Sequence, residues 1–302
     1  MLSKAATSTL LVSAYILCCM RIGARPWNFF KINSRYFCVR RGIFSKLDID
    51  NLVPPAWRLP QQRLCDDPAA LTYPVFVKPE WGQNARGIEI AHTPEDLASK
   101  AAQLGDEASG YIAQSAASGK REYEIYTINS ADRSLTPDLL SVTEVTNSSE
   151  SRPINSFRNP ASRYTDITHQ FNQQQKAQLA AYIREIGKFG HCRLCVKADS
   201  TSNLLSGDFH FIELNLYTPM PINLLDRNTT LSDQLAFIFK AAHGLARATR
   251  YNDNLPGSWR GSVWLRTNLY SYRKKHLEER HRYRDRPADV KQPAPKSQLT
   301  RV

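Results

Sequence analysis

The stretch Tyr73–Ile90, YPVFVKPEWGQNARGIEI, decides how the rest of the chain is interpreted. Its apolar start predicts a buried strand, which ends at Lys78 just before a loop that contains Gly82 and Gly87. Glycine lets the main chain approach an anion closely, and a lysine adds a positive charge at the same place. The stretch therefore predicts a phosphate-binding loop, with an ordinary glycine hairpin as the alternative.

A second stretch, Cys192–Pro221, reads CRLCVKADSTSNLLSGDFHFIELNLYTPMP. It predicts two strands joined by a polar turn around Ser200–Asp208, and the second strand ends with Glu213 and Asn215. Period-two spacing places both side chains on one face of that strand. Carboxylate and amide oxygens are the hard ligands that Mg²⁺ accepts while it also binds nucleotide phosphates. The alternative is that both residues only face solvent.

The two stretches together resemble the ATP-grasp superfamily, most closely its D-alanine–D-alanine-ligase-like branch. The VFVKP strand, the glycine loop, a GRxD-like strand (here CRLC) and an EIN-like strand (here ELN) follow in that superfamily's order, and the resemblance covers roughly Ser45 to Arg247. It implies an α+β fold in which two subdomains, each an antiparallel sheet with helices on one side, clamp ATP. It also implies ligation: ATP phosphorylates a carboxylate, and an amine or another nucleophile captures the acyl phosphate.

The resemblance implies a set of ATP-binding residues, with Ile112–Gln114 lining the adenine and Glu122 facing the ribose. Lys46 belongs to a segment similar to an ESK motif, but Phe44 replaces the acid, so a surface helix lysine is the alternative. Ala113 stands where related ligases often keep a glutamate, so the backbone or Gln114 would read the adenine amine. The full set is Lys46, Lys78, Gly82, Gly87, Ile112, Gln114 and Glu122.

The resemblance also implies a Mg²⁺ site and two catalytic arginines. Arg193 would stabilise the oxyanion of the reacting carboxyl group, and Arg163 would be the basic residue of a lid formed by Ser141–Thr168. Cys195 stands where the superfamily has its first metal-binding aspartate, and a neutral thiol is a poor ligand for Mg²⁺. Asp199, expected four residues farther on the same strand face, is a partial substitute. The implied metal ligands are Glu213, Asn215 and Asp199.

Two functional hypotheses follow from this departure. The first is an ATP-dependent carboxylate–amine ligase that uses ATP and Mg²⁺ with a small-molecule carboxylate and amine as substrates. The second is a nucleotide-binding protein with a degenerate metal site and little or no ligase turnover. The identity of the acyl donor and acceptor and the oligomeric state stay open.

The chain divides by composition into an apolar and basic region at 1–50, an ATP-grasp domain at 51–250, an extension at 251–270 and a basic tail at 271–302. The N-terminal region is shorter than the subdomain that the superfamily carries there. We expect helices at 93–104, 172–189 and 231–250. Six of the twelve net positive charges lie in the tail, which predicts a solvated segment; no motif for nucleic-acid binding accompanies it. A tail that binds a membrane surface or nucleic acid is the weaker alternative.

The run Ala5–Met20 predicts an apolar helix packed on the core, with a membrane anchor as the alternative. Six cysteines occur, and the pair Cys192 and Cys195 has no second pair at zinc spacing, so we expect buried strand residues. Reduced cysteines indicate a cytoplasmic location, with membrane association through the N-terminal run as the alternative.

Overall fold

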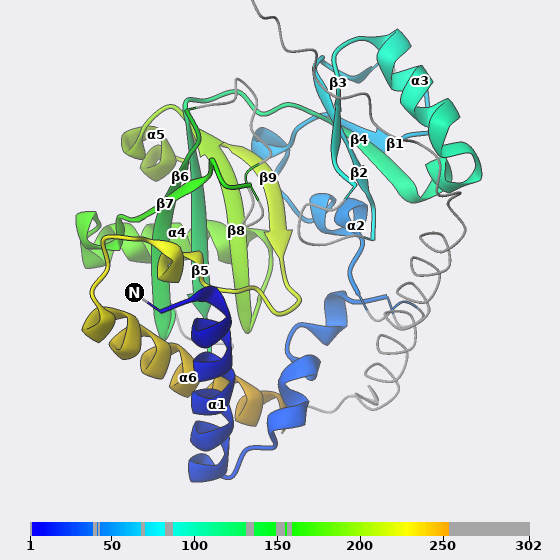
Figure 1. Ribbon diagram of the computed structural model, residues 1–302. Coiled ribbons are helices and arrows are strands. Elements are labelled where there is room, and N and C mark those ends of the chain that lie inside the picture. Colours follow the sequence, from blue (N-terminus) through cyan, green and yellow to red (C-terminus); the bar gives the residue numbers. More distant parts are fainter. Residues whose placement is uncertain are drawn as a thin grey trace, which may run out of the picture. The chain divides into compact units, whose positions relative to one another are not determined.

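The computed structural model describes residues 2–38, 41, 43–67, 70–81, 87–130, 136–148, 155 and 159–253. The chain divides into the units Met1–Gly261 and Ser262–Val302. The second unit, which includes the basic tail at 271–302, lies wholly outside the described residues. The first unit contains two antiparallel sheets with helices packed on them (Figure 1). This arrangement confirms the α+β class expected from the sequence.

The smaller sheet has the strand order β1-β4-β2-β3, and every neighbouring pair is antiparallel. One of its faces packs on α3 (Pro94–Leu104) through an apolar cluster that includes Val75, Val77 and Leu97. Thr93 caps α3, the helix expected at 93–104, by accepting a hydrogen bond from the Asp96 amide at 3.2 Å. The strands are β1 (Gln61–Arg63), β2 (Val75–Pro79), β3 (Glu89–Ala91) and β4 (Tyr111–Ser115).

The larger sheet has the order β7-β6-β5-β8-β9, again with antiparallel neighbours throughout. A register shift between Cys195 and Val196 marks a bulge in the pairing of β8 with β9. The strands are β5 (Arg121–Ile128), β6 (Leu139–Thr146), β7 (Arg163–Asp166), β8 (His191–Ala198) and β9 (His210–Asn215).

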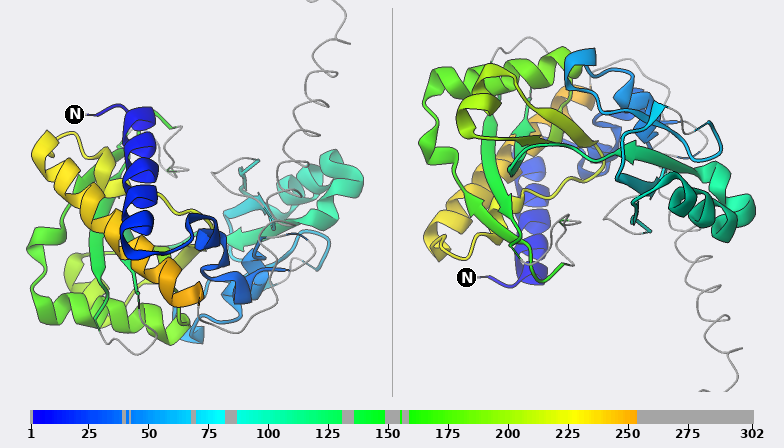
Figure 2. Two further views of the ribbon diagram at one scale, coloured as in Figure 1. Left: turned by 90° about the horizontal axis from the view of Figure 1, so that it is seen from below. Right: turned by 90° about the horizontal axis from the view of Figure 1, so that it is seen from above.

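The two faces of β5 have different coverings. Tyr123 and Ile125 pack into the cluster that contains α4 (Gln173–Ile186). Tyr126 and Ile128, on the other face, pack against α1 (Lys4–Ile22) and α6 (Leu231–Asp253). The views of Figure 2 show these helix groups on opposite sides of the sheet. Alternation puts Glu122 and Glu124 on the α1 and α6 side, but nearer the start of the strand.

Short helices complete the described part of the chain. The two α-helical turns are α2 (Lys46–Asp50) and α5 (Thr201–Ser206). The 3₁₀ turns are η1 (Pro26–Lys31), η2 (Ser34–Tyr36), η3 (Pro55–Trp57), η5 (Gly105–Gly110), η6 (Thr168–Gln170) and η7 (Ile222–Leu225).

Three local expectations are corrected by the structure. The polar turn at Ser200–Asp208 contains the helix α5, because the Ser200 hydroxyl caps it at the Asn203 amide. The helix expected at 172–189 ends three residues earlier, at Ile186, with Gly187 as its C-cap. The expected lid is partly strand: its two ends form β6 and β7, which pair with each other, and Arg158 lies outside the described residues.

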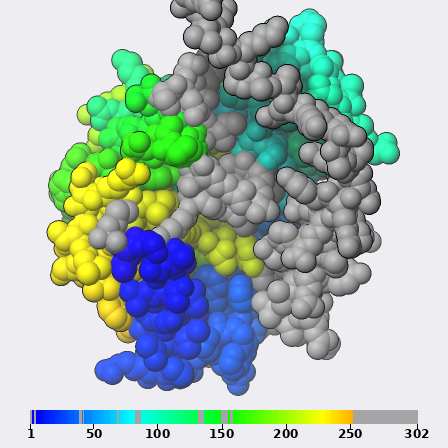
Figure 3. All heavy atoms as spheres, in the orientation of Figure 1, coloured from blue at the N-terminus to red at the C-terminus, as the bar shows by residue number. Residues whose placement is uncertain are grey.

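Helix α1 packs on α6 and places a second apolar face outward. Tyr15 hydrogen-bonds Thr249 at 2.9 Å, and Cys19 is fully buried. Val12 and Leu17 are exposed. Figure 3 shows the N-terminal part of the chain, in blue, at the surface. By length and composition alone α1 could cross a membrane, and 22% of the stretch Ala5–Ile22 is buried in the structure. Membrane association therefore stays a prediction.

The two cysteines of CRLC lie on β8 and are buried, as the sequence predicts, and all six cysteines are free. Their side chains face opposite sides of the sheet. Cys192 belongs to the apolar cluster beneath α4 and contacts the Thr127 hydroxyl at 3.3 Å. Cys195 faces the side that carries Glu122 and Glu124.

His191 is expected to make the protein sensitive to acid. Its ring is 2% exposed, neither ring nitrogen has a hydrogen-bond partner among the described residues, and burial lowers its pKa from 6.5 to about 3. Below pH 6.5 the unfolded chain therefore binds a proton that the folded chain does not, and stability falls. Between pH 7 and pH 5, the free energy of unfolding should fall by about 2 kcal/mol less in His191→Leu than in the wild type, as measured by urea unfolding. His92→Leu, a change at an exposed position, is the control. An equal fall in the free energy of unfolding in His191→Leu and in the wild type would contradict the role given to His191.

Candidate functional site

Lys78 lies near the end of β2 in a closed environment. It is 5% exposed, and its ammonium donates to Gln114 Oε1 on β4 at 2.7 Å. Gln114 in turn donates to the Ile212 carbonyl of β9 at 3.5 Å, which links the two sheets. Burial lowers the pKa of Lys78, and the carboxylates of Glu213 and Asp50 oppose this shift.

Lys46 begins α2 and reaches the same place from another direction. Its ammonium donates to the Pro79 carbonyl at 2.6 Å. Burial, together with the nearby ammonium of Lys78, lowers the pKa of Lys46 to about 8. The ammonium groups of Lys46 and Lys78 repel each other, so an anion bound between them would be stabilised.

Glu80 fixes α2 against the end of β2. Its two carboxylate oxygens accept hydrogen bonds from Ser45 at 2.5 Å and from Arg63 at 2.9 Å. Ser45 also caps α2 by accepting from the amides of the helix's first turn. The position of Lys46 is thus set by a buried acid immediately after the VFVKP strand.

A pocket separates these lysines from β9. Gln61 of β1 also lines it, and the Gln61 side-chain amide nitrogen is buried without a hydrogen-bond partner among the described residues. An unused donor beside two ammonium groups fits a ligand that carries acceptors and negative charge, as a nucleotide does. The lining residues are Phe44, Lys46, Ile49, Gln61, Lys78, Phe211, Ile212, Glu213, Leu214 and Asn215.

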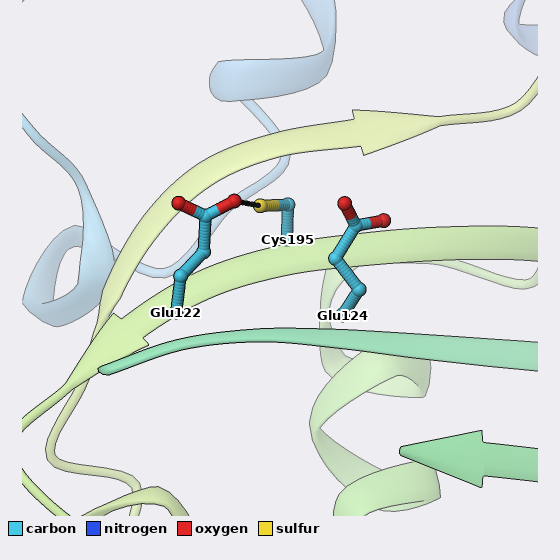
Figure 4. Close-up of side chains that lie close together, drawn as sticks. All are labelled: Glu122, Glu124 and Cys195. Atoms are coloured by element: carbon cyan, nitrogen blue, oxygen red, sulfur yellow. Dashed lines mark hydrogen bonds between the residues drawn. The ribbon is translucent and has the colours of Figure 1, made fainter. Parts of the chain in front are cut away.

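An acidic row crosses the larger sheet beside this pocket. Strand register places Glu124 of β5 opposite Cys195 of β8, and Cys195 opposite Glu213 of β9. Glu122 lies two residues from Glu124 on the same face. Figure 4 shows the side chains of Glu122, Glu124 and Cys195 side by side, with the Cys195 thiol directed at Glu122, and one ligand atom from each lies within 4.8 Å of the others.

Glu122 is held from both sides. One carboxylate oxygen accepts from the Cys195 thiol at 3.5 Å, and the other accepts from Asn155 at 2.8 Å. Asn155 in turn accepts from the Ser162 hydroxyl at 3.1 Å. Burial raises the pKa of Glu122, and these two hydrogen bonds limit the rise.

Arg193 balances part of this negative charge. Its Nε pairs with Glu124, and its Nη1 donates to the Met220 carbonyl at 3.0 Å. Burial raises the pKa of Glu124 to about 7, although Arg193 opposes the rise. Burial would also raise the pKa of Glu213, but Lys78 and Arg193 outweigh it and hold that pKa below its ordinary value.

The structure brings together most of the residues that the sequence assigned to the site. Gly87 has the positive φ of +67° that glycine adopts readily, while Gly82 lies outside the described residues. Ile112 is fully buried and pairs with Lys78 in the sheet. The residues around the pocket and the acidic row are Lys46, Lys78, Gln114, Glu122, Arg193, Glu213 and Asn215.

Two assigned residues lie elsewhere. The strand that should have carried Asp199 ends at Ala198, so Asp199 is exposed in the following bend and does not join the acidic row. Arg163 is exposed at the start of β7, where it donates to the Pro160 carbonyl of its own turn at 2.5 Å.

Sequence reasoning missed three residues that shape the site. Glu124 had a signal, because alternation places it on the face of Glu122, but its pairing with Arg193 depends on register that the sequence does not display. Glu80 directly follows the VFVKP strand, and Gln61 lies in a short edge strand; neither stands in a pattern that indicates a function.

Mg²⁺ is the cation that the superfamily resemblance implies, and the side chains fit it only in part. Glu213 and Asn215 offer oxygens, and they hydrogen-bond each other at 2.8 Å. The third position is the Cys195 thiol, which is 4% exposed, and Asp199 does not replace it. A soft sulfur ligand does not suit a hard cation, so the donor set as a whole does not fit Mg²⁺.

Of three comparisons with known proteins, only the comparison with solved structures found matches. No protein-family model and no curated protein matches the chain. Three similar solved structures are the L-amino acid ligase from Bacillus licheniformis (14% identity, TM-score 0.43), the D-alanine–D-alanine ligase from Bacillus anthracis (12%, 0.44) and the ATP-grasp ligase PsnB with Mg and ADP (17%, 0.41). The matches cover 66%, 68% and 66% of this chain and 47%, 66% and 58% of those structures.

The chain therefore spans about half to two thirds of the length of the structures that it matches. These structures are ATP-grasp ligases, but their TM-scores below 0.5 carry no argument about the activity of this chain.

Glu124 should be a major determinant of stability, because it neutralises a buried guanidinium. Glu124→Gln leaves Arg193 without its charged partner and is expected to lower the free energy of unfolding by about 3 kcal/mol. Glu144→Gln is the matched control, since it removes a pair with Arg121, which is 49% exposed, and should cost under about 1 kcal/mol. If urea unfolding shows that both variants lose the same free energy of unfolding, the Glu124–Arg193 pair stabilises the fold no more than an exposed ion pair does.

Proposed function

We propose that this chain is an ATP-dependent carboxylate–amine ligase of the ATP-grasp type. The observation that carries the proposal is one pocket in which the buried Lys78 and the half-buried Lys46 face the carboxylate and amide of Glu213 and Asn215. Cations on one wall and oxygen ligands on the other suit a polyphosphate that reacts at its terminal group.

The nucleotide phosphates would lie against the two ammonium groups. Repulsion between Lys46 and Lys78 contributes to the lowered pKa of Lys46, and a triphosphate would relieve it. Gln61 supplies the unused donor, and Gln114 positions Lys78 through the hydrogen bond at 2.7 Å. The base and ribose would then extend along β4 toward Glu122.

The chemistry would proceed in two steps. A substrate carboxylate attacks the terminal phosphorus of ATP, which releases ADP and leaves an acyl phosphate. An amine then attacks the acyl carbon, phosphate leaves, and the amine proton passes to solvent. Arg193, held by Glu124 and the Met220 carbonyl, would stabilise the negative oxygen that develops in the second step.

A second candidate is a nucleotide-binding protein with little or no turnover. The Cys195 thiol favours it, because it stands where the resemblance implies a hard metal ligand. Both candidates require the lysine wall, so they differ in turnover and not in binding. ADP release measured across a panel of amino acids and dipeptides separates them: stimulated release supports the ligase, and ATP binding without release supports the second candidate.

Lys78→Met should separate nucleotide binding from folding. The variant keeps an unbranched side chain in the buried position but loses the ammonium, so ATP affinity should fall about 10- to 100-fold. Its melting temperature should fall in part, because Glu213 loses one of the two cations that hold its pKa low, so ATP affinity is measured well below the melting temperature of the variant. Isothermal titration calorimetry measures the affinity, with Lys100→Met as control because Lys100 pairs with Glu89 on the smaller sheet's surface. Unchanged ATP affinity in a folded Lys78→Met protein would exclude the proposed phosphate site.

A further inference from the structure

We infer that the acidic row binds a borderline divalent cation of the Zn²⁺ class through Cys195, Glu122 and Glu124, in preference to Mg²⁺. The inference deepens the proposed function and rests on it for the role of the site, because it names the cation beside the nucleotide pocket. The starting point is the mismatch between a buried thiol and the hard cation that the superfamily implies.

The geometry already approaches a coordination shell. Two ligands come from β5 and one from the register-paired position of β8, and their ligand atoms lie within 4.8 Å of one another (Figure 4). Around Zn²⁺, with bonds of about 2.0 to 2.3 Å, neighbouring ligand atoms are roughly 3.5 Å apart. Rotation of the two glutamate side chains can supply this contraction of roughly 1 Å, while the strands stay fixed. Among the described residues, no other group of this kind occurs.

The two cysteines of the same strand have different surroundings. Cys192 faces the apolar cluster beneath α4, where a small hydrophobic side chain suffices. Cys195 is equally buried but faces carboxylates, and its thiol contacts Glu122 at 3.5 Å. A buried thiol among acids gains little from packing and becomes a strong ligand once a cation replaces its proton.

The ligands are also supported from outside. Asn155 donates to Glu122 at 2.8 Å and so orients the carboxylate, as residues behind metal ligands commonly do. The Glu124 oxygen that pairs with Arg193 is shielded from solvent. When the cation binds, a metal–sulfur bond replaces the S–H bond of Cys195, and the proton is released to solvent.

Sulfur in the donor set decides between cations. A thiolate favours Zn²⁺, Co²⁺ and Cd²⁺, whereas Mg²⁺ takes oxygen ligands and gives up its water reluctantly. Glu213 and Asn215 lie beside the cluster, so a cation there would also adjoin the phosphate wall of Lys78.

Titration of the full chain with Co²⁺ tests the inference, because a cobalt–thiolate bond produces charge-transfer absorption in the near ultraviolet. The wild type and Cys192→Ser should show the band, and Cys195→Ser should lose it and bind Co²⁺ about 100-fold more weakly. Equimolar Mg²⁺ should not displace the Co²⁺. No band in the wild type, or an unchanged band in Cys195→Ser, would overturn the inference.

Two further variants keep the test decisive. If Cys195→Ser does not fold, Glu122→Gln should still weaken Co²⁺ binding about tenfold, and unchanged affinity would count against the site. Cys195→Asp should reverse the preference, so that Mg²⁺ raises its melting temperature more than Zn²⁺ does; a preference for Zn²⁺ in that variant would contradict the role of sulfur. ATP binding measured with a metal chelator present reports the proposed function separately, since it depends on the lysines.

Discussion

The structure depends on the mutual neutralisation of charges buried on one face of the larger sheet. Glu124 pairs with Arg193, and Glu213 is kept ionised by Lys78 and Arg193 against the effect of burial. Removing any of these ions from water costs free energy that only a partner of opposite charge offsets. Glu122 has weaker support, from the Cys195 thiol and Asn155, and its pKa is raised. The negative charge of the acidic row is therefore not fully neutralised, and a bound cation would stabilise it.

The fold explains why this face is available for a site. Strands β5, β6, β8 and β9 of the larger sheet all contribute residues to the apolar cluster beneath α4. The opposite face is covered by α1 and α6 only over the end that carries Tyr126 and Ile128. Its other end remains for the acidic row, beside the pocket that also touches the smaller sheet through Lys46 and Lys78. One sheet thus provides both stability and chemistry from different parts of the same strands.

Sequence patterns predicted what depends on local periodicity. The strand that carries Lys78, the helix capped by Thr93 and the strand that ends with Glu213 all follow from apolar alternation and capping residues. Pairings between distant strands could not be derived in this way, which is why the ion pair of Glu124 and Arg193 was missed. Asp199 was misplaced because the strand ends at Ala198 and the chain turns into α5.

A crystal structure of the full chain with a non-hydrolysable ATP analogue tests the central claim most directly. The account predicts that the β- and γ-phosphates lie within hydrogen-bonding distance of the ammonium groups of Lys46 and Lys78, with the terminal phosphate directed toward Glu213. A nucleotide bound elsewhere, or an empty lysine pocket at a saturating concentration of the analogue, would contradict it.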